Sequence, residues 1–202
     1  LETFKAGDLL VFEGDDADAG VVVVSGRVAM LKTSASGKDL IVELLPPGDP
    51  FCLFPTIDDQ PFSVSLRAQI ESTVLWVPRS RFLAALDAHP EMSRKMVVDI
   101  FSRLRKSHDL SRALAHDLVE VRVASALLAL VPHFSRREDG NETEEFSIQM
   151  TRQELAEIIG STAETVIRVC KSLERDGLID LRKVGFVRLL DEGGLQRIAE
   201  QS

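Results

Sequence analysis

The segment from Met150 to Leu181 constrains this chain more than any other, because its pattern fits two short helices joined at a glycine. Thr151 can begin the first helix, and Glu154 three residues later completes a capping box. Apolar residues then recur at helical spacing as far as Gly160, which enters the left-handed turn that ends a helix at little cost. The segment therefore predicts a helix over 152–159 and a tight turn after it.

A second helix is expected to start at Ser161 or Thr162. Its inward residues are Val166, Val169, Cys170 and Leu173. Small Ala156, the turn glycine Gly160 and β-branched Val166 supply a close helix contact, a tight turn and an apolar residue between the helices. A helix-turn-helix needs these features at this spacing, and its second helix enters the major groove of DNA. The segment therefore predicts DNA binding.

The outward face of the second helix carries a carboxylate and a guanidinium four residues apart, Glu164 and Arg168. The pair is compatible with a solvent-exposed ion pair, which contributes only a few tenths of a kcal/mol. It is also compatible with base contacts, since a carboxylate accepts from cytosine and a guanidinium donates to guanine. Within a complete helix-turn-helix we favour base contacts. The predicted base contacts are Ala163, Glu164, Ile167 and Arg168, and the predicted phosphate contacts are Thr151, Arg152, Gln153, Ser161, Thr162, Thr165, Lys171 and Lys183.

Two apolar runs, 178–181 and 186–189, flank a basic turn with a glycine and predict a β-hairpin. Beside a helix-turn-helix such a hairpin is a wing, and Arg182 and Lys183 at its tip are candidate phosphate contacts. A strand over 146–150 is expected to pair with the wing. Around these elements we expect a helix over 118–134, a loop over 135–145 and a closing helix over 191–201.

Residues 1–78 have a different pattern, in which short β-rich segments alternate with glycine turns. Strands at intervals of about ten residues are typical of a β-sandwich or barrel. We expect strands over 9–12, 21–24, 28–31, 40–45, 64–68 and 73–77. Pro78 ends the last strand, and Ser80 is expected to cap a short helix over 81–88.

A long helix is predicted from Pro90 to about Ala115. Along it a seam repeats by four and three residues, as in a coiled coil. The seam residues are Val97, Phe101, Leu104, His108, Ser111 and Ala115, and Leu118 continues the pattern. The alternative is a helix packed on its own barrel, but much of the helix surface is polar because it carries Arg94, Arg103, Arg105 and Lys106. We therefore favour a dimer axis, which would place two recognition helices on successive major grooves.

Charge and cysteine content restrict the remaining classes. The net charge of −8 argues against broad DNA affinity, yet the segment from Arg168 to Arg188 has six basic and three acidic residues. Cys52 and Cys170 lie far apart, which argues against a disulfide framework or a zinc site, and no other metal site is predicted. No apolar run of 18 residues and no signal-peptide pattern occurs, so we expect a cytoplasmic protein.

Enzymatic activity is not expected, because paired carboxylates such as Asp15-Asp16 lie in predicted turns and no nucleophile has a base at a meaningful spacing. A second interpretation is a ligand-binding module that acts through protein contacts, with the winged helix as its interaction surface. DNA binding that weakens as salt rises would distinguish the two interpretations.

The order of motifs resembles the Crp/Fnr superfamily of bacterial transcription regulators over essentially all residues. The motifs are KAGDLLVFEGD, VSGRV, PPGDPF, the long helix and TRQELAEIIGSTAETVIRVCKSLERDGLI. The resemblance implies an α+β fold, with an effector-sensing, cyclic-nucleotide-binding-like double-stranded β-roll over 1–88, a dimerisation helix over 89–116 and a winged helix-turn-helix over 117–202. It implies a homodimer that binds a palindromic operator in double-stranded DNA under control of a small effector, with RNA polymerase as a further partner.

The family's recognition helix places a glutamate and an arginine four apart on base edges, which maps onto Glu164 and Arg168. Some members carry an arginine just before the glutamate, where this chain has Ala163. The resemblance therefore implies a half-site that lacks one guanine contact.

The effector site departs from the cyclic-nucleotide pattern. Nucleotide-binding members carry a glutamate for the ribose and an Arg-Ser pair for the phosphate, and these positions fall near Cys52 and on Phe62-Ser63. A buried phosphate would lack its countercharge, so cyclic AMP is not expected. The predicted effector pocket is Phe51, Cys52, Leu53, Phe54, Phe62, Ser63, Ser107 and His108. Its apolar part suits a flat ligand such as haem, or no ligand at all.

Two residues of this pocket have alternative roles. His108 is either an exposed seam residue or a group that ligates iron or titrates near neutral pH. Cys52 is either a redox switch or, as we favour, a small buried hydrophobic residue. The N-terminal cysteine group that holds the iron–sulfur cluster of the Fnr branch does not occur in this sequence. The sequence begins at Leu1, so preceding residues of the natural protein are expected.

Overall fold

The computed structural model describes residues 1–49, 55–137 and 146–201. Its internal contacts divide the chain into two compact units, Leu1–His108 and Asp109–Ser202. Each unit has its own buried core. The predicted boundaries, at 88/89 between the β-roll and the dimerisation helix and at 116/117 between that helix and the winged helix-turn-helix, stay a prediction.

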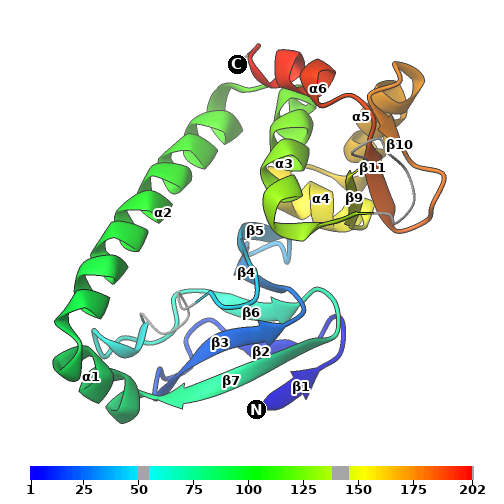
Figure 1. Ribbon diagram of the computed structural model, residues 1–202. Helices are drawn as coiled ribbons and strands as arrows, with labels where there is room; N and C mark the ends of the chain where they lie inside the picture. The colour runs from blue at the N-terminus through cyan, green and yellow to red at the C-terminus, as the bar shows by residue number, and fades with distance from the viewer. Residues whose placement is uncertain (50–54, 138–145, 202) are drawn as a thin grey trace. The chain divides into compact units, whose positions relative to one another are not determined.

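The first unit is built on two antiparallel sheets whose inner faces share one core (Figure 1). One sheet has the strand order β1 (Glu2–Phe4), β7 (Ser72–Pro78) and β3 (Ala19–Ser25). The other has the order β2 (Leu9–Val11), β6 (Ser65–Ala68), β4 (Val28–Thr33) and β5 (Asp39–Leu45). Alternate residues point inward, so Val21, Val23 and Val74 of the first sheet meet Val28, Leu45 and Leu66 of the second. The predicted β-roll is confirmed, and β1 is an additional strand.

The turn in the motif VSGRV allows the two sheets to approach each other. Gly26 has φ 92°, and a Cβ atom there would lie 2.3 Å from the Ser72 hydroxyl oxygen. That hydroxyl oxygen accepts a hydrogen bond from the Arg27 amide at 3.0 Å. Any larger residue at position 26 would displace this buried contact between the turn that precedes β4 and the first residue of β7.

Two helices follow the roll, α1 (Arg79–Ala88) and α2 (Pro90–His116). The prediction that Ser80 caps α1 was wrong: the helix begins at Arg79, directly after the last strand, and no side chain caps it. Phe82 of α1 packs against Met96 of α2 and against residues of β3 and β7. This small core attaches the start of α2 to the roll.

The predicted seam of α2 is exposed among the described residues. Val97, Phe101 and Leu104 are 52%, 56% and 46% exposed, and His108 is also exposed. Met96 is the buried residue of this helix. In a single chain the described residues therefore leave the apolar seam open to solvent.

The second unit begins with α3 (Val119–Phe134) and ends with α6 (Glu192–Ala199). Between them lie β8 (Ser135–Arg137), β9 (Phe146–Gln149), α4 (Arg152–Ile159), α5 (Ala163–Arg175), β10 (Ile179–Asp180) and β11 (Phe186–Leu189). The strand order is β10-β11-β9-β8, and β9 pairs with β11 as predicted. The loop predicted over 135–145 was wrong at its start, because Ser135–Arg137 pair with β9; the rest lies outside the described residues.

The core of this unit forms where α3 packs against α4, α5 and α6. Leu127, Leu155, Leu173 and Leu195, one from each of these helices, are fully buried. The closing helix is shorter than expected, since Asp191 caps it and Ala199 ends it. Across the described part of the chain, none of the helices combines the length and apolar character required to span a membrane.

Candidate DNA-binding site

In α4, the first helix of the predicted motif, specific capping residues mark both the start and the end. The Glu154 amide donates to the Thr151 hydroxyl oxygen at 3.1 Å, and the Thr151 amide donates to the Glu154 carboxylate at 2.7 Å. This is the predicted capping box. Gly160 ends the helix with φ 61° and ψ 50°, the left-handed conformation that glycine adopts at little cost.

The second helix, α5, begins at Ala163 after the cap Thr162, whose hydroxyl oxygen accepts from the Thr165 amide at 3.3 Å. Val166, Cys170 and Leu173 are fully buried, which fixes the rotation of the helix about its axis. Burial raises the pKa of the Cys170 thiol, as expected for a cysteine that acts as a core residue. The opposite face of α5 must therefore point to solvent.

That exposed face gathers three of the four predicted base contacts, whereas the fourth, Ala163, is half-buried and does not line the hollow on this face. Glu164, Ile167, Arg168 and Lys171 line a surface hollow of about 430 Å³ together with Ser172 and Arg175. Neither Glu164 nor Arg168 has an ion pair or a side-chain hydrogen bond with any described residue. The intrahelical ion pair that the sequence also allowed is therefore not formed. Among the described residues, both charged groups are therefore without a partner and remain accessible to DNA.

Of the threonines predicted to contact phosphates, Thr151 and Thr162 are helix caps and Thr165 lies in the first turn of α5. Thr151 and Thr165 keep a hydroxyl proton to donate. The Thr151 hydroxyl accepts from the Glu154 amide and retains its proton. The Thr162 hydroxyl donates to that of Thr165 at 3.1 Å, which leaves the Thr165 proton. Ser161 is half-buried in the turn.

The two side chains at the start of α4 already have protein partners, and Gln153 is exposed. Arg152 donates from Nη2 to the Phe186 carbonyl of the wing at 3.5 Å, and its Nη1 is buried. Gln153 donates its amide to Glu157 at 2.9 Å. Arg152 could contact a phosphate only if its guanidinium left the wing. We therefore consider it a weaker candidate for a phosphate contact than the threonines.

The wing orders its basic residues around one carboxylate. Arg182 donates from Nη2 and Nε to Asp180 at 2.6 and 2.9 Å, and Arg188 Nη2 lies 3.3 Å from the same carboxylate. The hydrogen bonds from Arg182 are the largest cause that lowers the pKa of Asp180 to about 2, and the positive charges of Arg182 and Arg188 act in the same direction. Asp180 therefore stays ionised and reduces the positive charge that Arg182 can present to a phosphate.

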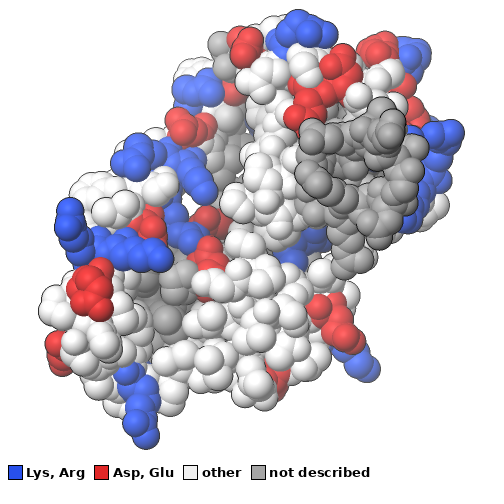
Figure 2. Space-filling model, viewed as in Figure 1, with Lys and Arg blue, Asp and Glu red and all other residues white. Residues whose placement is uncertain are grey.

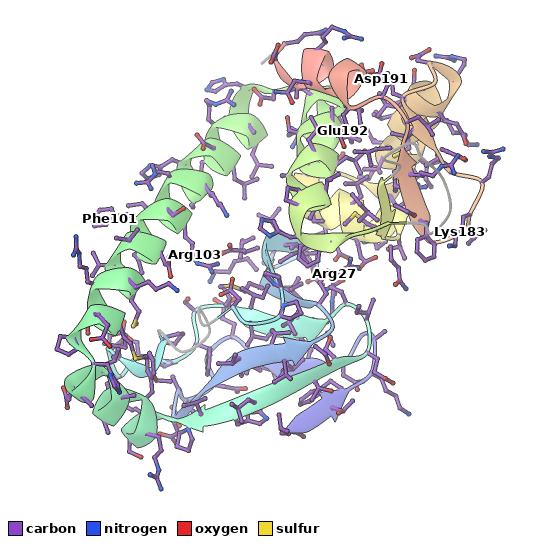
Figure 3. All side chains as sticks on the ribbon, viewed as in Figure 1. Arg27, Phe101, Arg103, Lys183, Asp191 and Glu192 are labelled. Atoms are coloured by element: carbon purple, nitrogen blue, oxygen red, sulfur yellow. The ribbon has the colours of Figure 1, made fainter. Side chains whose placement is uncertain are left out.

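Lys183 of the wing makes a different contact from Arg182 and Arg188. Its ammonium lies 4.2 Å from the centroid of the Phe186 ring, which is a cation–π contact. Figure 2 shows Lys and Arg side chains gathered over the wing, and Figure 3 shows Lys183 at its outer edge. The wing thus presents positive charge beside α5 within the same unit.

The predicted effector pocket can be followed only in part, because Phe51, Cys52, Leu53 and Phe54 lie outside the described residues. The first unit contains a cavity of about 440 Å³ that includes Phe62 and Ser63. Its other lining residues are Met30, Pro55, Ile57, Asp58, Gln60, Pro61, Val64, Leu66 and Ile100. Ser107 and His108 do not line it, and the described residues include no group of three or more His, Cys, Asp or Glu arranged to hold a metal.

Sequence reasoning missed an ionic cluster in the same unit. Arg103 of α2 donates from Nη2 to both carboxylate oxygens of Asp49, at 2.7 and 2.6 Å, and its Nη1 lies 2.5 Å from Glu43. Burial opposes the charge of Arg103, but the two carboxylates more than compensate and its pKa is raised. Figure 3 shows Arg103 and Phe101 on opposite sides of α2, so the helix is tied to the roll on one side and open on the other.

Comparisons with known proteins agree with this architecture. A cyclic nucleotide-binding domain model matches residues 1–89, and a Crp-like helix-turn-helix domain model matches residues 121–198. The chain is 30% identical to the nitrogen fixation regulation protein FixK of Azorhizobium caulinodans over 187 residues, which is 92% of this chain and 74% of that protein. It is 28% identical to the cAMP-activated global transcriptional regulator CRP of Escherichia coli O157:H7 over 182 residues, 89% of this chain and 84% of that one.

Solved structures show the same fold. FixK2 from Bradyrhizobium japonicum superposes with a TM-score of 0.84 at 22% identity, over 98% of this chain and 95% of that one. A transcriptional regulator of the CRP/FNR family from Thermus thermophilus superposes with a TM-score of 0.77 at 26% identity, over 98% and 97% of the two chains. With a β-roll, a long helix and a winged helix-turn-helix DNA-binding domain in this order, and with relatives that match nearly its whole length, the chain belongs to the Crp/Fnr family of transcription regulators.

Proposed function

We propose that two copies of this chain pair through the seam of α2 and insert their α5 helices into successive major grooves of a palindromic operator. The observation that carries this proposal is the pair Glu164 and Arg168, which are exposed on α5 and have no partner in the part of the chain that the structure describes. The family consists of transcription regulators rather than enzymes, so RNA polymerase and the cytoplasm complete the proposal as partner and location. Promoter choice then depends on which bases these two side chains contact.

The open seam supports the pairing step. Val97, Phe101 and Leu104 are each about half exposed, and covering them would contribute on the order of 2–4 kcal/mol per helix. A symmetric pair of helices uses the same residues twice, so each apolar group meets its own copy or a near neighbour. Two identical reading helices then require two inverted copies of one half-site.

The test starts from DNA selected by the wild-type protein out of randomised duplexes, so that no operator is assumed. Arg168→Ala should weaken binding to the selected duplex by about 1–3 kcal/mol and relax the choice at one base pair. Arg81→Ala on α1 removes the same charge from an exposed site in the first unit and should leave binding unchanged. Equal affinities of the wild-type and Arg168→Ala proteins would refute the base contact.

A module that acts only through protein contacts is the competing function. Phosphate contacts release counterions, so the logarithm of the operator association constant should fall linearly as the logarithm of salt concentration rises. Lys183→Ala should reduce that slope by about one unit and weaken all DNA sequences alike. Selection that enriches no DNA sequence would favour the protein-contact function instead.

The effector is proposed to be a small neutral or apolar molecule, bound in the cavity of the first unit. Residues 50–66 contain no Lys, Arg or His, whereas they contain Asp58 and Asp59. An anionic phosphate in a cavity flanked by this segment would have no countercharge from it, and burying an unpaired charge is costly. Cyclic AMP is therefore a poor candidate, although several relatives are described as cAMP-activated.

Two probes separate the effector classes. A neutral apolar dye should bind more tightly than cyclic AMP, and Ile100→Asn should weaken the dye because Ile100 lines the cavity. Val98→Asn changes an exposed residue of the same helix that does not line the cavity and should leave dye binding intact. For haem, we expect no Soret band that depends on His108, since His108 does not line the cavity; a band lost in His108→Ala would establish iron ligation instead.

A further inference from the structure

We propose that Ile167 selects a thymine in the operator by contacting the C5 methyl group of that base. This inference rests on the proposed insertion of α5 into the major groove, and it names a base feature that the charged residues cannot recognise. It follows from one apolar side chain that the structure places among charged ones on the reading surface.

Ile167 has no role in the core that would account for an apolar residue at its position. It is 41% exposed, whereas the core contacts of α5 are made by Val166, Cys170 and Leu173, each fully buried. Along the whole of α5, Ile167 is the one exposed apolar side chain. Its immediate surroundings are the charged groups that line the same hollow: Glu164, Arg168, Lys171 and Arg175.

The helix geometry places Ile167 beside the charged reading pair. Ala163 and Ile167 are four residues apart, as are Glu164 and Arg168, so each pair forms a line along the helix. Successive residues are separated by about 100° around the axis, so the two lines run side by side. The reading face therefore carries a polar stripe of Glu164 and Arg168 and an adjacent apolar stripe of Ala163 and Ile167.

In the major groove, thymine is the base that presents an apolar group at its edge, the C5 methyl. An isoleucine against this methyl removes apolar surface of both partners from water. Against cytosine, adenine or guanine the same side chain would cover polar groups without offering a hydrogen bond, which is unfavourable. The apolar stripe therefore favours thymine at the base pair it covers, next to those contacted by Glu164 and Arg168.

Uracil replacement isolates the methyl group, because uracil pairs as thymine does and differs only in lacking it. In the duplex selected by the wild-type protein, each thymine of one half-site is replaced in turn by uracil, and affinity is measured by titration. At one position the wild-type protein should lose about fourfold in affinity, the effect expected for one buried methyl group. A duplex with cytosine at this position should bind more weakly still, and 5-methylcytosine there should recover part of the loss.

The variants assign the effect to one side chain. Ile167→Ala should bind the thymine and uracil duplexes equally, and Ile167→Val should show an intermediate ratio. Val184→Ala, at an exposed apolar position of the wing, should keep the fourfold ratio of the wild-type protein. Because Ile167 and Val184 both lie outside the core, all three variants should unfold at the wild-type temperature, which a thermal scan verifies.

The outcomes separate this inference from the proposed function. A selected duplex that depends on Arg168 but shows no uracil effect at any thymine would overturn the role of Ile167 and leave DNA reading intact. A uracil effect that persists in Ile167→Ala would likewise assign the methyl contact elsewhere. Failure to select any sequence would overturn both proposals.

Discussion

Asp180 shows how one residue controls the wing. Its carboxylate accepts hydrogen bonds from Arg182 and lies within ion-pair distance of Arg188, and its side chain is only 12% exposed. Without that carboxylate, the two guanidinium groups would lie close together with no countercharge at this position. The folded wing therefore depends on the ionised form of Asp180.

The first prediction concerns the pH dependence of this contact. The pKa of Asp180 is about 2 in the folded chain, below the value of about 3.9 expected in the unfolded chain. Its stabilisation is therefore complete above about pH 5 and is lost as pH falls towards 2. Asp180→Asn should lower the free energy of unfolding by about 1 kcal/mol at pH 7, and the difference from wild type should shrink below pH 4.

Urea unfolding at several pH values measures this difference. Asp109→Asn, a change at an exposed carboxylate of α2, serves as the control and should show no such pH-dependent difference. A constant difference between Asp180→Asn and wild type from pH 7 down to pH 3 would contradict the assigned contact.

At the scale of elements, α2 has two different sides. Arg103 binds Asp49 and Glu43, which follow or lie in β5, while Val97 and Phe101 face solvent. The ion pairs are mostly buried, with side-chain exposures of 17% for Arg103 and 11% for Asp49. They therefore set the rotation of α2 on the roll and, through it, the direction in which the seam points.

The second prediction follows from that burial. Arg103→Ala leaves two carboxylates close together in a partly buried place without a cation, and should lower the free energy of unfolding of the first unit by about 3 kcal/mol. Arg105→Ala changes an exposed arginine of the same helix and should lie within about 0.5 kcal/mol of wild type. Urea unfolding followed by the fluorescence of Trp76, which lies in β7 of the same unit, reports the effect.

If the two arginine variants were equally stable, the ion pairs of Arg103 would contribute no more than a solvent-exposed pair. The seam could then not be assigned a direction from this contact. A loss confined to Arg103→Ala would identify the two carboxylates left without a cation as the cause.

At the scale of the whole molecule, the proposed regulator is a pair of chains. Phe101→Asp places a carboxylate in the seam of each chain, where two copies would meet in a low-dielectric contact. The variant should sediment as a monomer at concentrations where wild type sediments as a dimer. Its affinity for the selected duplex should fall because the dimer is lost. Val24→Asp, at an exposed apolar site on β3, should leave the dimer intact.

A wild-type protein that sediments as a monomer would refute the pairing, whatever the variants do. A Phe101→Asp protein that remains dimeric would instead place the interface on another surface. Since each chain supplies one α5, a loss of pairing should reduce the preference for two half-sites over one.

Local patterns in the sequence were sufficient for the reading unit. The capping box at Thr151, the left-handed Gly160 and the outward Glu164 and Arg168 all depend on residues within one or two helical turns of each other. A helix satisfies its own backbone hydrogen bonds, and its buried stripe determines which residues face outward. The sequence alone could therefore predict the helix-turn-helix and its exposed face.

Tertiary structure decided what depends on residues far apart in the chain. Arg103 and Asp49 are separated by 54 residues, and Arg152 finds its carbonyl partner 34 residues away in the wing. No local pattern distinguishes these arginines from their solvent-exposed neighbours, because their partners are set by how sheets and helices pack. The sequence by itself determined which helix can read DNA; packing across the fold decided which charges are free to do so and which hold the protein together.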